Sequence, residues 1–196
     1  MELKDSKTKI NLMRAFAGES QARNRYDMAA SYAKKEGFQV IESVFKYTAC
    51  QEKAHAKVFY DFLRCSSGEN IQIDDAAYPI DIYDSVEKYL KAANHNEMEE
   101  HDVVYKSFSD IAKEEGFDRI AVTFQNIAKV EKIHGNRFEE YYIKLTNNTL
   151  FNSEEEAQWM CTNCGYIFEG KAVPLVCPVC AYPRGYFMAV ENNMPK

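Results

Sequence analysis

The sequence predicts an all-α four-helix bundle followed by a small C-terminal β domain built around four cysteines. Residues 26–59 and 105–138 are related by an offset of 79 positions, with thirteen identities in 34 pairs, so one helical hairpin is written twice. Apolar residues in both copies recur with the period of an α-helix. Four of the six cysteines lie in residues 161–180 as two Cys-x-x-Cys pairs, a metal-binding pattern.

Each expected helix carries one apolar stripe, and glycines mark where the hairpins turn. The stripes include Leu12, Ala15, Phe16, Ala22 and Tyr26; Ile41, Val44, Phe45 and Phe59; Val86, Leu90, Ala93 and Phe108; and Ile120, Phe124, Ile127 and Phe138. Gly37 and Gly116 each follow a Lys/Glu-rich turn and suit the left-handed residue that ends a helix.

The segment between the hairpins, residues 66–81, contains Gly68 and Pro79 and predicts a long crossover. Two hairpins joined by one long crossover describe a ferritin-like bundle. We therefore assign residues 1–146 to the bundle, 147–156 to a linker and 157–196 to the C-terminal domain.

Composition and charge exclude some classes of function. The chain has 196 residues and a net charge of -6, which argues against non-specific binding to nucleic acid. No apolar run approaches the roughly 20 residues of a membrane helix, and residues 1–10 have no signal-peptide core. We expect a cytoplasmic protein with no nucleic-acid or membrane partner.

Acidic residues occupy stripe positions where a packed core normally has Leu or Ile. They are Glu19, Glu52, Glu97, Glu100 and Glu131. A buried carboxylate is costly without a counter-charge, so several on converging faces indicate a bound metal.

Two of these acids belong to Glu-x-x-His pairs, Glu52 with His55 and Glu131 with His134. This spacing places both side chains on one helical face. Two such pairs and a glutamate from each remaining helix form a di-iron or di-manganese carboxylate site. The alternative is that each pair is a surface accident or holds a core histidine; the repeat offset and the apolar flanks favour metal.

Other polar side chains lack this context. We expect His95 and His101 at the surface or behind the ligands, and Cys50 and Cys65 as small buried apolar residues. Tyr26, seven residues after Glu19, either holds a ligand carboxylate or is a core tyrosine.

The four clustered cysteines form two knuckles separated by twelve residues. They are Cys161, Cys164, Cys177 and Cys180. Four thiolates give a tetrahedral site for zinc or for a single iron. Alone, the motif favours a structural zinc ribbon; beside a di-iron site, a one-electron iron centre has a use, so we expect iron.

Five motifs stand in the order typical of one family: AFAGESQARNRY, QEKAH, the Glu97/Glu100 pair, VEKIH and CTNCGY…CPVC. In these motifs the chain resembles rubrerythrin over nearly its whole length. The resemblance implies that Glu52 and Glu131 bridge two irons. It implies that Glu19, with either Glu100 or His55, binds one iron and that Glu97 and His134 bind the other.

The resemblance also implies the remaining roles and the activity. Tyr26 and Tyr105 would hydrogen-bond ligand carboxylates, and the four clustered cysteines would hold a rubredoxin-type iron. The expected activity is an NADH-linked peroxidase that reduces hydrogen peroxide to water, with Glu100, His55, Tyr26 and Tyr105 as catalytic residues. Electrons would come from an external protein, a rubredoxin or an NADH-dependent reductase, and the chain would form a homodimer or a larger assembly.

Two alternatives belong to other classes of function. An iron-storage or ferroxidase protein of the ferritin class would have these helices but does not need the cysteine module. A structural zinc-ribbon protein with a silent bundle leaves the inward glutamates unexplained.

Two finer hypotheses concern the third helix. Glu97 precedes Tyr105 by eight residues, whereas Glu19 precedes Tyr26 by seven, which predicts a π-bulge between Glu97 and Tyr105. Anionic carboxylate suits ferric iron and imidazole suits ferrous iron. We therefore hypothesise that Glu100 binds one iron in the diferric state and His55 binds it in the diferrous state.

Overall fold

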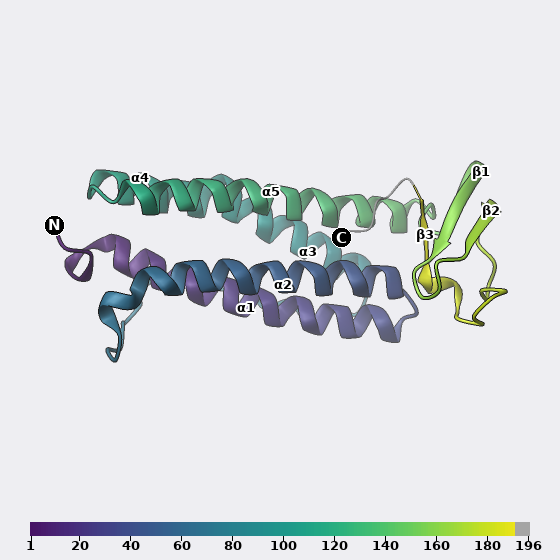
Figure 1. Ribbon diagram of the computed structural model, residues 1–196, viewed down its shortest axis with the longest axis horizontal. Helices are drawn as coiled ribbons and strands as arrows, with labels where there is room; N and C mark the ends of the chain where they lie inside the picture. Colours follow the sequence, from purple (N-terminus) through teal and green to yellow (C-terminus); the bar gives the residue numbers. More distant parts are fainter. Residues whose placement is uncertain (191–196) are drawn as a thin grey trace.

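The computed structural model describes residues 1–190 and confirms the ferritin-like bundle with a small C-terminal β region. The bundle consists of α1 (Lys7–Lys35), α2 (Gln39–Phe62), a third helix in three parts, and α5 (Asp118–Thr146). The parts of the third helix are α3 (Val86–Glu99), a π-helical segment η3 (Glu100–Val104) and α4 (Tyr105–Glu114). Figure 1 shows the four long helices lying side by side along one axis.

The two hairpin turns follow the sequence prediction. Gly37 and Gly116 have φ values of 83° and 84°, in the left-handed region. The amide of Phe38 donates to the carbonyl of Ala33 at 2.9 Å, and residues 117 and 112 repeat the bond at 2.8 Å. These are the closing bonds of a Schellman motif, which ends one helix and turns the chain into the next.

The π-helical segment confirms the predicted defect in the third helix. The amide of Tyr105 donates to the carbonyl of Glu100, five residues earlier, where a regular helix would use the fourth. The extra residue is therefore absorbed between Glu97 and Tyr105 without a break in the helix.

The N-terminus of α1 is held by the opposite hairpin. Ser6 caps the helix, accepting a hydrogen bond from the amide of Lys9 at 3.1 Å. The Glu115 carboxylate accepts from the amides of Lys7 and Thr8 at 2.9 and 2.8 Å. An anion is favourable at a helix N-terminus, so this contact ties the α4–α5 turn to α1.

The crossover runs from the short 3₁₀ segment η2 (Leu63–Ser66) to Ser85, with no helix or strand after residue 66. It joins the end of α2 to the start of α3 (Figure 1). Asp81 fixes it to the bundle, because its carboxylate contacts Arg25 and accepts from the Asn96 amide at 2.9 Å. Within residues 1–190, every helix is too short or too polar to span a membrane.

The C-terminal module is a three-stranded antiparallel sheet in the order β2-β1-β3. The strands are β1 (Asn152–Cys161), β2 (Ile167–Ala172) and β3 (Phe187–Ala189). The expected linker, residues 147–156, is shorter than the sequence suggested, because β1 begins at Asn152. Residues 191–196 of the expected domain lie outside the described part of the chain.

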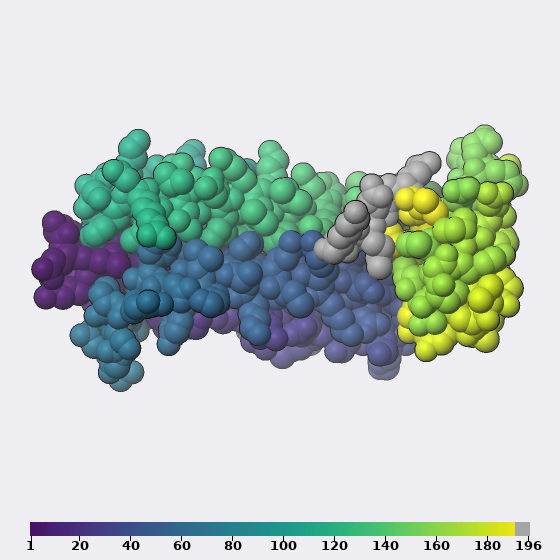
Figure 2. All heavy atoms as spheres, in the orientation of Figure 1, coloured from purple at the N-terminus to yellow at the C-terminus, as the bar shows by residue number. Residues whose placement is uncertain are grey.

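The module packs against the bundle end where α1 turns into α2 (Figures 1 and 2). Phe151 stacks on Phe38 with ring centroids 6.2 Å apart, and the Arg184 guanidinium lies over the Phe151 ring at 4.9 Å. Buried Trp159 and Phe187 belong to the same hydrophobic cluster as the bundle residues. Bundle and module therefore share one core instead of being separated by a free linker.

Candidate metal centres

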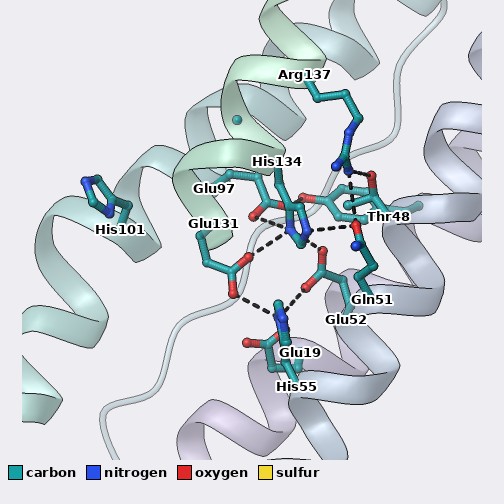
Figure 3. A network of polar contacts seen from close by, with 12 residues as sticks. Glu19, Thr48, Gln51, Glu52, His55, Glu97, His101, Glu131, His134 and Arg137 are labelled. Carbon is teal, nitrogen blue, oxygen red and sulfur yellow. Dashed lines mark hydrogen bonds and ion pairs between the residues drawn. The ribbon is translucent and has the colours of Figure 1, made fainter. Parts of the chain in front are cut away.

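The inward-facing acids and histidines converge in the middle of the bundle. Glu19 comes from α1, Glu52 and His55 from α2, Glu97 from α3, and Glu131 and His134 from α5. Apart from the half-buried His55, each is at most 1% exposed. Helical periodicity explains the arrangement, since each residue lies on the apolar stripe of its own helix. Figure 3 shows the six side chains pointing toward one another.

Two overlapping groups of ligands form, and two glutamates belong to both. His134 Nδ1 lies 2.8 Å from Glu131 Oε2, 3.0 Å from Glu52 Oε1 and 3.6 Å from Glu97 Oε2. His55 Nδ1 lies 3.0 Å from Glu131 Oε1, 3.4 Å from Glu52 Oε2 and 3.7 Å from Glu19 Oε2. Because Glu52 and Glu131 each present one oxygen to each group, they are the residues that could be shared by two metal ions.

Many of the donor atoms are buried without a hydrogen-bond partner among the described residues, and bound metal ions would take the place of one. Both carboxylate oxygens of Glu52 and of Glu131 are buried without a hydrogen bond in the described structure. One oxygen each of Glu19 and Glu97 and the Nδ1 atoms of both histidines share this state. Buried polar atoms are normally paired, and this many together at one point fits a pair of divalent cations.

Without metal, the electrostatics of the cluster are dominated by burial and by imidazole protons. Burial raises the pKa of Glu19 well above its usual value and that of Glu97 to about 8. Burial acts in the same direction on Glu52, but the imidazoles of His134 and His55 outweigh it and lower its pKa to about 2. Burial opposes protonation of His134, yet Glu131 and the other carboxylates raise its pKa to about 12. Protons thus provide the positive charge that metal ions would replace.

Two tyrosines donate hydrogen bonds to Glu19 and Glu97, the glutamates that each belong to one donor group, and each bond joins one hairpin to the other. The Tyr26 hydroxyl, from α1, donates to Glu97 Oε1 on α3. The Tyr105 hydroxyl, from α4, donates to Glu19 Oε1 on α1. Burial raises the pKa of both tyrosines, so both hydroxyls remain protonated donors. Each glutamate is left with one free oxygen for a metal.

A polar chain behind His134 was missed by the sequence analysis. His134 Nε2 lies 3.0 Å from Gln51 Oε1, which accepts from Arg137 Nη1 at 3.2 Å. Arg137 also donates to Thr48 Oγ1 at 2.9 Å, and Figure 3 shows the chain leading away from the cluster. Such partners orient a ligating imidazole. The repeat gave no signal, since Val130 stands where Gln51 has its counterpart.

Glu100 is the acid that the structure leaves outside both ligand groups. It begins η3, is half-buried and lines a cavity beside α1. Burial raises the pKa of its carboxyl group well above the usual value. Glu100 and His55 were the two candidates to bind a metal together with Glu19, and only His55 lies in the donor group that contains Glu19.

The two other histidines lie apart from the metal-binding cluster, as expected, whereas the two other cysteines differ from expectation. His95 is exposed, and His101 turns its Nδ1 to the carbonyl of Ala128 at 2.7 Å, away from the cluster (Figure 3). The expectation that Cys50 and Cys65 are buried was wrong. Both thiols are exposed, since Cys50 faces outward from α2 and Cys65 lies in η2 at the bundle end.

The four clustered cysteines converge in the module. Their sulfurs lie within 4.8 Å of one another, with Cys161–Cys180 and Cys164–Cys177 Sγ distances of 3.7 Å. That spacing is too long for disulfides and suits four thiolates around one tetrahedral ion. Cys161 and Cys177 are buried, whereas Cys164 is exposed, so one side of the site faces solvent.

The fold and the two centres define a class: a ferritin-like di-metal carboxylate protein that carries its own rubredoxin-like module. Family models described as rubrerythrin and as the rubrerythrin rubredoxin-like domain match residues 11–142 and 159–188. Rubrerythrin-1 of Clostridium acetobutylicum is 45% identical over 97% of this chain and 98% of its own length. Rubrerythrin of Porphyromonas gingivalis is 44% identical over 97% and 94%. The chain belongs to the rubrerythrin family.

Structural likeness agrees with this membership. A solved structure of nigerythrin is 27% identical with a TM-score of 0.63, covering 94% of this chain and 90% of that one. A bacterioferritin from Desulfovibrio desulfuricans, 20% identical with a TM-score of 0.63, covers 73% and 82% and shares the bundle fold. Family and donor sets together make the protein an iron-dependent oxidoreductase with a di-iron site and one iron held by four cysteines.

Proposed function

We propose that the protein is a peroxidase that reduces hydrogen peroxide to water, with electrons passing through the four-cysteine iron. The observation that carries the proposal is the presence of a two-metal site and a one-electron site in one chain. Peroxide needs two electrons and two protons to become two waters. When bound, the two irons supply the electron pair that splits the O–O bond.

The side chains around the di-iron site suit this reaction. Glu52 on α2 and Glu131 on α5 belong to both donor groups and would hold both metals when these are bound. The hydroxyls of Tyr26 and Tyr105 keep the terminal carboxylates oriented as ligands. Glu100 alone among the five acids is half-buried instead of buried, so we propose that it exchanges protons with solvent.

We further propose that the protein works as a homodimer or larger assembly. Within one chain, Gly185 of the module meets α2 near Gln39, whereas Glu52 lies thirteen residues further along α2. At 1.5 Å per residue that is about 20 Å, and electron tunnelling falls exponentially with distance. A module from a second copy, docked beside the middle of the bundle, would shorten the route. The module offers exposed apolar side chains near its metal site: Leu175, Val176, Val179 and Tyr182.

The terminal electron donor would be a separate protein, a rubredoxin or an NADH-dependent reductase. The sequence contains no G-x-G-x-x-G fingerprint for binding NADH itself. Four cysteines that bind a metal as thiolates, without forming disulfides, suit a reducing compartment such as the cytoplasm.

The test is anaerobic consumption of hydrogen peroxide by the iron-loaded protein with NADH, a reductase and a rubredoxin. We expect the double variant Cys161→Ser/Cys164→Ser to lose turnover while its far-UV circular dichroism keeps the helical signal. The matched control is Cys50→Ser/Cys65→Ser, since both thiols are exposed and lie outside the metal site. Wild-type rates in the first double variant would refute the proposed electron route.

Storage of iron, the ferritin-class alternative, predicts a different result. Continued uptake of ferrous iron far beyond three per chain, unaffected by the cysteine changes, would favour storage. Colour separates iron from zinc in the module, because a ferric tetrathiolate site is red and a zinc site is colourless.

A further inference from the structure

A cavity of about 360 Å³ lies between α1 and the third helix, under residues Asp75–Pro79 of the crossover. Two residues from the di-iron region, Glu100 and Tyr105, form part of its wall. Tyr105 donates its hydroxyl to Glu19, so one wall of the cavity is formed by a residue that contacts the metal-binding cluster.

The lining suits a small, uncharged polar molecule. Apolar walls come from Ala15, Val103, Val104 and Phe108, with polar groups from Gln21, Asn96 and Glu100. Acidic groups at Asp75 and Glu99 disfavour anions. Arg14 does not offset them freely, because its guanidinium donates to the carbonyl of Asp74 at 2.5 Å and to Asn11 at 3.3 Å. Hydrogen peroxide, which is neutral near pH 7, fits this chemistry.

Tyr78 forms the cover of the cavity. Its hydroxyl donates to the carbonyl of Arg14 at 3.0 Å, which draws the ring down onto α1. The crossover is fixed on one side of this ring by the Arg14–Asp74 bond and on the other by Asp81. Residues 75–80 between these points have no helix or strand, so the Tyr78 bond holds the cover in place.

Gly18 lies directly beneath Tyr78. It is buried in the middle of α1, where glycine destabilises a helix relative to alanine. Its backbone is ordinary helix, so no unusual φ requires glycine there. A Cβ at this position would lie 3.7 Å from Tyr78 Cε1, an ordinary contact. Gly18 therefore leaves room for no more than a methyl group beneath the Tyr78 ring, which packs closely on α1 one residue before Glu19.

We propose that the cavity beneath Asp75–Pro79 is the entry passage for peroxide, and that Tyr78, packed over Gly18, sets its size limit. The passage then admits hydrogen peroxide and excludes bulky organic hydroperoxides. This inference rests on the proposed peroxidase function. Cumene hydroperoxide would take the same two electrons and two protons, yielding an alcohol and water, once it could enter.

The experiment compares kcat/KM for cumene hydroperoxide and for hydrogen peroxide in iron-loaded variants. Tyr78→Ala should raise the ratio of the two about tenfold by removing the cover. Tyr78→Phe, which keeps the ring and loses only its bond to Arg14, should raise the ratio less. Gly18→Ala should lower the ratio without lowering the melting temperature. The control Tyr60→Ala changes an exposed tyrosine outside this cavity.

A second measurement does not depend on peroxide chemistry. Ferrous iron in the reduced protein is released to the neutral chelator 2,2′-bipyridine, and the coloured complex is followed with time. Tyr78→Ala should accelerate release about tenfold relative to Tyr60→Ala, and Gly18→Ala should slow it. Equal release rates and equal peroxide ratios in all variants would overturn the passage. If no variant reduces any peroxide, the proposed function fails, and the release rates still decide whether the passage exists.

Discussion

Removal of one tyrosine hydroxyl from the di-iron site should weaken metal binding by a predictable amount. In Tyr26→Phe, Glu97 loses the hydrogen bond to its Oε1 and keeps the His134 Nδ1 atom, 3.6 Å from its Oε2. In Tyr105→Phe, Glu19 loses the equivalent bond. Partners that orient a metal ligand are typically worth 10–100-fold in affinity, or about 1.4–2.7 kcal/mol. We expect each single variant to fall in this range.

Anaerobic titration of the metal-free protein with ferrous iron against a competing chelator measures the affinity. Tyr141→Phe is the matched control, because Tyr141 is 7% exposed and its hydroxyl makes no hydrogen bond to any residue of the described chain, 1–190. In the metal-free protein the same changes leave a buried carboxylate oxygen unpaired, at about 1–3 kcal/mol of folding stability. Affinities of Tyr26→Phe and Tyr105→Phe equal to that of Tyr141→Phe would refute the orienting role of the hydroxyls.

Three further predictions address docking, pH and the third helix. In Gly185→Ala, the added Cβ would lie 2.0 Å from the backbone of the α1–α2 turn, so the module must shift. We expect the variant to lose about 1–3 kcal/mol of folding stability and to show a changed Trp159 emission. An unchanged melting curve would contradict this expectation. In metal-free protein the folded pKa values of Glu97, about 8, and His134, about 12, exceed their ordinary 4.5 and 6.5, so stability present at low pH is lost as pH rises. The melting temperature of the metal-free protein should therefore fall between pH 6.5 and 8, whereas that of the metal-loaded protein should not. If both melting temperatures change with pH in the same way, the assignment of Glu97 and His134 to the metal site is wrong. Glu100→Ala should still bind two irons but lose much of its peroxide turnover, and crystal structures of the oxidised and reduced wild type showing identical coordination would exclude the ligand exchange.

Local periodicity explains why so much of the bundle could be predicted from sequence. An α-helix has 3.6 residues per turn, so spacing alone shows that Glu19, Glu52, Glu97 and Glu131 lie on the apolar faces of their helices. The π-helical segment was predictable for the same reason, since the repeat supplied a second copy whose spacing differed by one residue.

Contacts between distant segments were beyond that reasoning. The Gln51–Arg137 chain joins two helices through side chains with no counterpart in the repeat. The docking of the module depends on Gly185 and the α1–α2 turn, which are far apart in sequence. The outward orientation of Cys50 also depends on which neighbours cover α2, a property that composition does not reveal.

The crossed tyrosine bonds mean that neither hairpin completes a metal site by itself. Each lends a hydroxyl to the other's glutamate, as two identical hairpins related by a two-fold axis would. The one-residue insertion at η3 breaks that symmetry: Glu100 has no acidic counterpart, because Gln21 and Ala22 stand at the related positions. The two groups of donor atoms are therefore unequal in their surroundings. A side chain in the second hairpin, Glu100, thus offers a carboxylate near the cluster for which the first hairpin has no equivalent.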